Sequence, residues 1–153
     1  MKIRLAKDED YAKIARLHRQ TIRNVNSKDY TEEQIRIWSA RTNAERFRSN
    51  MGKCKRWVAT KDDKVVGFCD HSLDGEFWGL YVHKDFIGKG IGSRLLKTAE
   101  DSLKKMGFKK VSLKATVTAK DFYKKQGYKV IKKGLHPINN QKLEIFNMAK
   151  RLY

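Results

Sequence analysis

The most constraining feature of the sequence is a cluster of three glycines, Gly88, Gly90 and Gly92, between two apolar segments. The segment before it, residues 77–82, is β-prone and of strand length. The segment after it repeats apolar residues at helical spacing, namely Ile91, Leu95, Leu96, Ala99 and Leu103. A strand, a glycine turn and a helix start leave unpaired backbone N–H groups at the positive end of a helix dipole, which suits an anion such as phosphate. Glycine is needed because a side chain would hold a ligand away from these donors.

Two well-known phosphate loops do not fit this cluster. A P-loop requires Lys-Ser or Lys-Thr after its second glycine, and the sequence has neither at that position. A dinucleotide-binding fold requires Gly-x-Gly-x-x-Gly and an acidic residue about 20 positions further on. The glycines here are spaced Gly-x-Gly-x-Gly, and Lys109 and Lys110 occupy that region instead of an acid. The cluster therefore predicts a phosphate site of another class.

The rest of the chain predicts a mixed order of strands and helices. Strands are expected at 2–5, 57–60, 65–69, from about 76, at 111–115, 128–131 and 143–148, with a turn at 61–64 and a connection at 136–140. Helices are expected from the cap Asp8, the capping box Thr31–Gln34 and Asn43, from about Lys89 to Met106, and from Thr118 to Gly127. The strand–helix–strand segment between 76 and 115 predicts a right-handed parallel crossover, and a cleft is expected where its two strands part.

Two blocks of the sequence resemble the GNAT (general-control-related N-acetyltransferase) superfamily. Ile87-Gly88-Lys89-Gly90-Ile91-Gly92 is similar to the family's acetyl-CoA loop, Gln/Arg-x-x-Gly-x-Gly/Ala, with Ile87 in place of Gln or Arg. Residues 115–128 are similar to the family segment Asn-x-x-x-x-Phe-Tyr-x-Lys-x-Gly-Phe, with Thr118 in place of Asn. The resemblance covers the whole chain and implies a single α/β (α+β) domain over residues 1–153. Its implied sheet is mixed, mostly antiparallel and twisted, with about six or seven strands flanked by helices and a V-shaped cleft between two parallel strands.

The resemblance also implies acetyl-CoA as co-substrate. The residues expected to bind it are Leu80, Tyr81, Val82, Ile87, Gly88, Lys89, Gly90, Ile91, Gly92, Ser93, Thr118, Tyr123 and Lys125. Thr118 keeps a hydroxyl for the pantetheine arm, although its position favours a helix cap. Phe122 is expected to pack in the core while Tyr123 faces the cleft.

Acyl transfer from a thioester to an amine needs a neutral amine, a polarised carbonyl and a proton for the leaving thiolate. Glu76 is the candidate base, because GNAT enzymes often have a glutamate at this place; a solvated Glu after a glycine turn is the alternative. Tyr123 matches the family tyrosine that donates to the coenzyme sulfur, with a core tyrosine as the alternative. A backbone N–H near Val82 is expected to polarise the carbonyl. Neither Cys54 nor Cys69 lies in a family block, so direct attack in a ternary complex is expected rather than a covalent acetyl-enzyme.

The acceptor is expected to be a small-molecule or peptide amine. Tyr30 and Trp38 lie in the region that helps to shape the acceptor site in GNAT-like chains, and they are candidate pocket walls; for Trp38, anchoring a helix to the sheet is the alternative. Asp70 is a further acceptor candidate, and Asp70 and Asp74 are alternative bases. His18, on the apolar stripe of the first helix, is expected to pack at the core or the cleft edge. An acidic mouth is expected from Glu32, Glu33, Asp70, Asp74 and Glu76.

The chain carries a formal net charge of +18, and residues 84–133 hold 15 Lys and Arg against 4 Asp and Glu. Such a field attracts a polyanion. Coenzyme A, a nucleic acid and a general solubility bias all remain open, so a nucleic-acid-binding protein on the same fold is one alternative function. A CoA-binding regulator without turnover is another, suggested by the departures at Ile87 and Thr118. No signal peptide, membrane-length apolar run or Cys-x-x-Cys motif is present, so a cytoplasmic, metal-free monomer or homodimer with reduced cysteines is expected.

Overall fold

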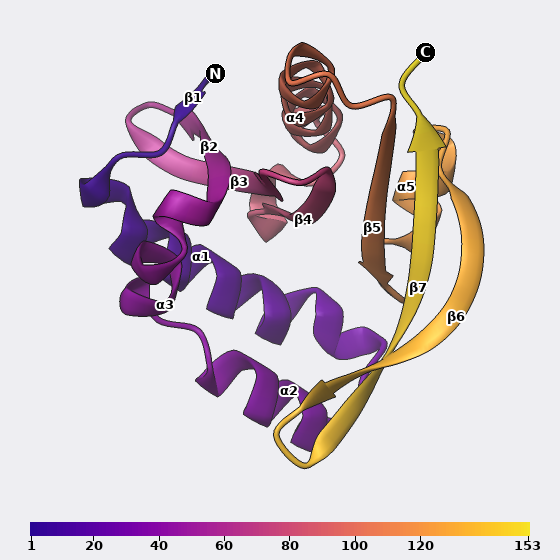
Figure 1. Ribbon diagram of the computed structural model, residues 1–153. Coiled ribbons are helices and arrows are strands. Elements are labelled where there is room, and N and C mark those ends of the chain that lie inside the picture. The colour runs from indigo at the N-terminus through magenta and orange to yellow at the C-terminus, as the bar shows by residue number, and fades with distance from the viewer.

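Seven strands form one sheet in the order β1-β2-β3-β4-β5-β7-β6 (Figure 1). The computed structural model describes residues 1–153. Every neighbouring pair of strands is antiparallel except β4 and β5, which are parallel, so the predicted mostly antiparallel sheet with one parallel step is confirmed. The strands are β1 (Lys2–Leu5), β2 (Cys54–Lys61), β3 (Lys64–Ser72), β4 (Glu76–Val82), β5 (Lys110–Thr116), β6 (Lys129–Ile138) and β7 (Gln141–Arg151).

Five α-helices flank the sheet. They are α1 (Tyr11–Asn24), α2 (Glu32–Ala40), α3 (Ala44–Ser49), α4 (Ile91–Lys105) and α5 (Lys120–Lys125). The caps predicted at Thr31 and Asn43 are confirmed, because their side chains accept hydrogen bonds from the N–H groups of Gln34 and Arg46. Gly107, which has φ +94°, follows the end of α4 as predicted.

The cap predicted at Asp8 is wrong. Asp8–Asp10 forms a 3-10 turn, and α1 begins only at Tyr11. The carboxylate of Asp10, which is 1% exposed, accepts a hydrogen bond from the Lys7 N–H at 2.7 Å and pairs with Arg4 at 2.7 Å. The buried acid of this cluster therefore ties α1 to β1, whereas Asp8 is exposed.

Side-chain alternation along β2 and β3 decides which helix covers which face of the sheet. Ala59 and Cys69 lie in one buried cluster with Leu95 of α4. Val58 and Phe68, their neighbours in sequence, lie in another cluster with residues of α1. Because successive residues of a strand point to opposite faces, α4 and α1 pack on opposite faces of the sheet.

The C-terminal hairpin is longer than predicted. Residues 136–140 were expected to connect two short strands, but β6 runs to Ile138 and only Asn139 and Asn140 form the turn. Pro137 fits within β6 because this strand is the edge of the sheet, where a missing N–H breaks no ladder. The tip of the hairpin lies beside α2 (Figure 1), where a third apolar cluster forms from Ile22, Ile35, Ile37, Trp38, Ile138 and Leu143.

A cleft opens where β4 and β5 separate. The two strands pair only at Glu76 with Ser112 and at Phe77 with Leu113. On its other side β4 has a bulge, since His71 lies opposite Phe77 and Asp70 opposite Gly79, which leaves Trp78 without a partner in β3. The predicted splaying of the two parallel strands is therefore present, and β4 beyond Phe77 has one edge free of β5.

The buried pair Arg56–Asp70 crosses β2 and β3 and provides a test of the fold. The Arg56 Nε lies 2.8 Å from Oδ2 of Asp70, and the two side chains are only 4% and 7% exposed. Replacing Asp70 by Asn should lower the free energy of unfolding by about 3–5 kcal/mol, because it leaves an uncompensated buried guanidinium. Urea denaturation measures this loss. Glu33→Gln, which breaks an exposed pair with Arg36, is the control and should change little; an equal loss in both variants would contradict the importance of burial.

Candidate active site

The residues between β4 and α4 form an open loop. Gly88 and Gly90 have φ of +82° and +83°, a region in which other residues are strained. A Cβ atom on either glycine would meet no atom within 4 Å, so the space beside the loop is open. The left-handed Gly90 ends the loop, and α4 therefore begins at Ile91 rather than near Lys89 as expected.

The start of α4 presents backbone donors to that open space. Gly90 occupies the N-cap position and supplies no side chain to cap the helix. The N–H groups of the first turn thus keep their capacity to bind an anion, which the helix dipole favours. Gly92 matters for a different reason: its Cβ would lie 3.4 Å from the Phe122 ring and 3.5 Å from Leu80, so the helix start packs closely against β4 and α5.

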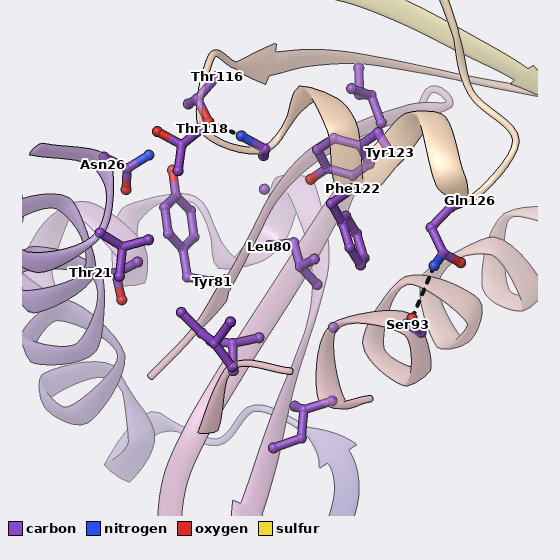
Figure 2. Close-up of a pocket in the computed structure, with 18 of the residues that line it drawn as sticks. Thr21, Asn26, Leu80, Tyr81, Ser93, Thr116, Thr118, Phe122, Tyr123 and Gln126 are labelled. Atoms are coloured by element: carbon purple, nitrogen blue, oxygen red, sulfur yellow. Dashed lines mark hydrogen bonds between the residues drawn. The ribbon is translucent and has the colours of Figure 1, made fainter. Parts of the chain in front are cut away.

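A cavity of about 460 Å³ runs from this loop along β4 to α5. Its walls include twelve of the thirteen residues predicted to bind the coenzyme: Leu80, Tyr81, Val82, Ile87, Gly88, Gly90, Ile91, Gly92, Ser93, Thr118, Tyr123 and Lys125. Lys89 is the exception. Its Nζ lies 5.2 Å from the centre of the Phe86 ring and outside the cavity wall. On the α5 side the wall is fastened to α4 by a hydrogen bond from Gln126 to Ser93 at 3.0 Å (Figure 2).

Tyr123 is a buried residue of this cavity wall. It is 4% exposed, and its ring centre lies 6.2 Å from that of Phe77 and 5.3 Å from that of Phe122. Phe122 packs against the core and Tyr123 lines the cavity, as expected. Phe122 also lines the cavity and Tyr123 also belongs to the core cluster, so the two rings are not divided between core and cleft (Figure 2). Burial raises the pKa of the Tyr123 hydroxyl well above its usual range, and Tyr81 nearby raises it further. The hydroxyl therefore stays protonated and keeps a proton to donate.

Two buried polar atoms in the cavity wall have no partner in the protein. The Oγ1 of Thr118 accepts no hydrogen bond, so the expected capping role of Thr118 is wrong; the Oγ1 of Thr116 accepts from the Ala119 N–H at 3.2 Å instead. The Oδ1 of Asn26, in the 3-10 turn that follows α1, is the second such atom. Figure 2 shows Asn26, Thr118 and the hydroxyl end of Tyr81 pointing toward one another across the cavity. Buried polar atoms normally have partners, so these are candidate contacts for a polar ligand.

Asn26 was not singled out from the sequence. It lies in a short polar run between two predicted helices, where an asparagine is ordinary. Only the tertiary arrangement brings the 3-10 turn after α1 beside the turn that follows β5. No local pattern carries that information.

A second cavity, of about 290 Å³, adjoins the first across the gap between β4 and β5. The two cavities share the wall residues Phe77, Trp78, Tyr81, Lys114 and Thr116. Glu76 and Trp38 line the second cavity, and Trp38 also packs in the α2 cluster. A ligand held along β4 in the first cavity can therefore meet a second ligand in the other.

Two acceptor candidates lie in the wall of neither cavity. The hydroxyl of Tyr30 donates to the carbonyl of Glu144 at 2.7 Å and accepts from the Val117 N–H at 2.9 Å, so it joins the α1–α2 connection to β7 and the end of β5. Asp70 is buried in its pair with Arg56. Both predictions are wrong because these side chains are used in holding the fold together.

The expected acidic mouth is also wrong. Of its five members only Glu76 lines the second cavity. Glu33 pairs with Arg36 on α2, and Asp74 accepts a hydrogen bond from Ser72 in the β3–β4 turn. Apart from the Tyr81 phenol, the other ionisable residues of the second cavity are basic or imidazole groups: His18, Arg41, Arg46, Lys114 and His136.

The cysteines lie away from both cavities, and neither a metal cluster nor a membrane-spanning helix is found. Cys54 and Cys69 are free and buried, and burial raises the pKa of both thiols. Neither lines either cavity. No group of three or more His, Cys, Asp or Glu gathers as a metal site. None of the helices combines the length and the apolar character needed to cross a bilayer.

An open mixed sheet with two splayed parallel strands and a glycine loop at the start of the following helix defines an α/β fold with an anion site beside a cleft. The model of the Acetyltransferase (GNAT) domain matches residues 26–152. The chain therefore belongs to the GNAT acetyltransferase family, which supports acyltransferase activity.

Solved structures agree with this assignment. A GCN5-related N-acetyltransferase from Rhodopseudomonas palustris is 26% identical, with a TM-score of 0.93 over 98% of this chain and 94% of that one. The PaiA N-acetyltransferase from Thermoplasma acidophilum, in complex with coenzyme A, is 24% identical with a TM-score of 0.73, covering 99% of each chain. An aminoglycoside 6′-N-acetyltransferase complexed with coenzyme A is 18% identical with a TM-score of 0.70, covering 100% of this chain and 98% of that one. The last two show the fold alone; acetyl-CoA as co-substrate is consistent with the family.

The neutral state of His18 in the second cavity gives a test by pH. Burial, with Arg46 and Arg19 nearby, lowers the pKa of His18 to about 3. His18 therefore gains a proton near pH 6.5 in the unfolded chain but stays neutral in the folded protein. The free energy of unfolding should fall as the pH drops below 6.5. The loss attributable to this group should be about 1.4 kcal/mol per pH unit, continuing toward pH 3.

The variant His18→Gln isolates this contribution. It keeps a polar group beside the Thr42 hydroxyl, which lies 2.8 Å from the Nδ1 of His18. Its free energy of unfolding, measured in urea at pH 7 and pH 5, should fall less between the two than that of the native protein. Equal losses would mean that His18 titrates normally in the folded state.

Proposed function

We propose that this protein is an N-acetyltransferase that moves an acetyl group from acetyl-CoA to a primary amine by direct attack in a ternary complex. The observation that carries the proposal is the adjacency of the two cavities. One is lined by the glycine loop and by Tyr123, and the other contains Glu76. They meet where β4 and β5 part, so a thioester from one side can meet an amine from the other.

Coenzyme A fits the first cavity by its chemistry. Its pyrophosphate matches the backbone donors at Gly88–Gly92 and the start of α4. Lys125 in the wall supplies a positive charge for the same group. The amides of the pantetheine arm match the unpaired oxygen atoms of Asn26 and Thr118, each of which can accept or, for the hydroxyl, donate a hydrogen bond. Structures of similar fold that hold coenzyme A support this assignment.

The acyl-transfer chemistry divides between two side chains. Glu76 accepts a proton from the attacking amine, directly or through a water molecule, because most of a primary amine is charged at neutral pH. The amine nitrogen then forms a bond to the thioester carbon, and the carbon–sulfur bond breaks. Tyr123 donates its proton to the departing thiolate. Because burial raises the pKa of its phenol, Tyr123 is protonated at neutral pH and has this proton to give.

A backbone N–H of β4 is the proposed donor to the carbonyl oxygen. Val82 was expected in this role, but it lies five residues beyond Phe77, a distance of about 16 Å along the strand. The ring of Phe77 is the one that lies beside Tyr123. An N–H in the segment Trp78–Leu80 lies closer to Tyr123 and beside the bulge at Trp78. We therefore propose that segment, where β4 no longer pairs with β5.

A covalent acetyl-cysteine is not favoured. Neither thiol lines a cavity, and burial raises the pKa of both, which disfavours the nucleophilic thiolate. The Sγ of Cys69 donates to the carbonyl of Leu95 at 3.4 Å, inside the core. Direct attack remains the route that the available side chains support.

Kinetics of two conservative variants test the proposed roles. Glu76→Gln and Tyr123→Phe should each lower kcat by about 10²- to 10⁴-fold, because each removes one proton transfer from the reaction. The dissociation constant for acetyl-CoA should stay within about threefold of the native value, since neither change touches the glycine loop. Free-thiol release with a panel of primary amines gives the rates, and calorimetry gives the affinity.

Tyr128→Phe is the matched control. Tyr128 lies 5.7 Å from Tyr123 between ring centres, and its hydroxyl donates to Glu100 outside both cavities. Its kcat should be close to the native value. Native rates in the Glu76 and Tyr123 variants would contradict the assigned roles. Tight coenzyme binding without any thiol release by the native protein would instead favour a CoA-binding regulator.

A further inference from the structure

The second cavity carries an unusual charge for a site that must receive an amine. Arg41 follows the end of α2, Arg46 lies on α3 and Lys114 lies on β5, so three separate elements each bring one cation to it. The only carboxylate in its wall is Glu76. A simple amine or a polyamine, itself a cation, would meet net repulsion at this entrance.

These three cations have no partners within the protein. None of the side chains of Arg41, Arg46 and Lys114 makes an ion pair or a hydrogen bond. Neighbouring basic side chains behave differently: Arg48, also on α3, pairs with Asp8 at 2.9 Å and with Glu45 at 3.4 Å. The cavity therefore holds positive charge that the fold leaves uncompensated.

The cations also lie close enough to affect one another's surroundings. Burial lowers the pKa of Arg46, and Arg41 lowers it further. Burial lowers the pKa of His136 in the same cavity wall, and Lys114, Arg41 and Arg46 each add to that shift. An anion bound among them would relieve this repulsion and gain charge-assisted hydrogen bonds.

A surface bias in a basic protein would spread cations without regard to cavities. Here the exposed or partly exposed cations share the cavity wall with buried apolar side chains, namely Trp38, Ile138, Leu143 and Ile145. Glu76, at the beginning of β4, is the one carboxylate residue in the same wall. Cations, one carboxylate and apolar side chains in one wall match a molecule that carries both an amine and an anion.

We propose that the acceptor is a small amine that also carries an anionic group, with a carboxylate, as in an amino acid, as the expected source. Its ammonium group lies at Glu76, where it loses a proton, and its carboxylate binds Arg41 and Arg46. Lys114 stands on the wall shared with the coenzyme cavity and assists from there. This inference rests on the proposed acetyl transfer and names the substrate class of that site.

Matched acceptors provide the test. Free-thiol release from acetyl-CoA is measured with amino acids such as L-leucine, and with the corresponding carboxamides, which keep the amine and lose the anion. O-Phosphoethanolamine tests phosphate as the anion, and spermidine tests a polycation. The anionic acceptors should give kcat/KM values roughly tenfold to hundredfold higher than the carboxamides or spermidine, through KM. The amine of an amino acid carboxamide is less basic than that of the amino acid and loses its proton more easily. Deprotonation alone would therefore favour the carboxamide, and it cannot produce a preference for the amino acid.

Variants tie the preference to the cations. Arg41→Gln and Arg46→Gln should each raise the KM for the anionic acceptor roughly tenfold or more while leaving the KM for acetyl-CoA and for the carboxamide unchanged. Arg46→Lys should restore part of the loss. Arg48→Gln, on the same helix but paired outside the cavity, is the control and should behave as the native protein. Equal use of carboxamides, or native KM values in the Arg41 and Arg46 variants, would overturn the inference.

A binding measurement separates this inference from the proposed activity. In the presence of coenzyme A, L-leucine should raise the melting temperature of the native protein more than leucinamide does, and the difference should vanish in Arg46→Gln. If that difference appears without thiol release, acetyl transfer is overturned and the anion site stands. If thiol release occurs without any preference for the anion, the anion site alone is overturned, and absence of both overturns both.

Discussion

The parallel pairing of β4 with β5 ends after two residue pairs, and both cavities depend on that separation of the strands. Beyond Phe77 the edge of β4 lacks a neighbouring strand, and its backbone groups face a cavity instead of a ladder. The sheet stays intact because α4 and α1 cover opposite faces of the β2–β4 half, while α2 packs against the β6–β7 hairpin. One apolar cluster also joins β2, β3 and β4 to β5 and β7 through α4, so the opening lies within a sheet that is packed on both sides of it (Figure 1).

The features that could be predicted from the sequence are those encoded locally. The positive φ values of Gly88 and Gly90 demand glycine, and the helical spacing that follows them needs no tertiary context. The parallel crossover follows from strand and helix lengths. The caps at Thr31 and Asn43 are likewise short-range. The prediction at Asp8 failed because the buried carboxylate of this acidic run is that of Asp10, which binds Lys7 and Arg4 and does not cap α1.

The features that could not be predicted depend on contacts between distant segments. Tyr30 was assigned to the acceptor pocket, but its hydroxyl is held by backbone groups of Val117 and Glu144. Asp70 is buried in an ion pair with Arg56, which lies 14 residues earlier in the chain. Thr118 resembled a helix cap, and only the structure shows its hydroxyl without a partner inside a cavity. The charge of the second cavity is of the same kind, since its cations come from three elements.

The high net charge of +18 is understandable under both proposals, because coenzyme A is a polyanion and the acceptor carries an anionic group. The glycine loop and Lys125 face the coenzyme phosphates, and Arg41 and Arg46 face the carboxylate of the acceptor. Positive charge at each end would attract coenzyme A from solution and orient the carboxylate of the acceptor away from Glu76. Glu76 then stands as the local exception that receives the ammonium group.

Calorimetric titration with acetyl-CoA of the native protein, Gly90→Val and Gly52→Val tests the central claim most directly. Gly90 has φ +83° beside the open cavity, whereas Gly52 has no atom within 4 Å of its Cβ position, has no positive φ and lies outside both cavities. Circular dichroism checks that all three proteins are folded. If backbone amides at the glycine loop bind the pyrophosphate, Gly90→Val should weaken binding about tenfold or more while Gly52→Val binds as the native protein does. Equal affinity for acetyl-CoA in all three would contradict the claim.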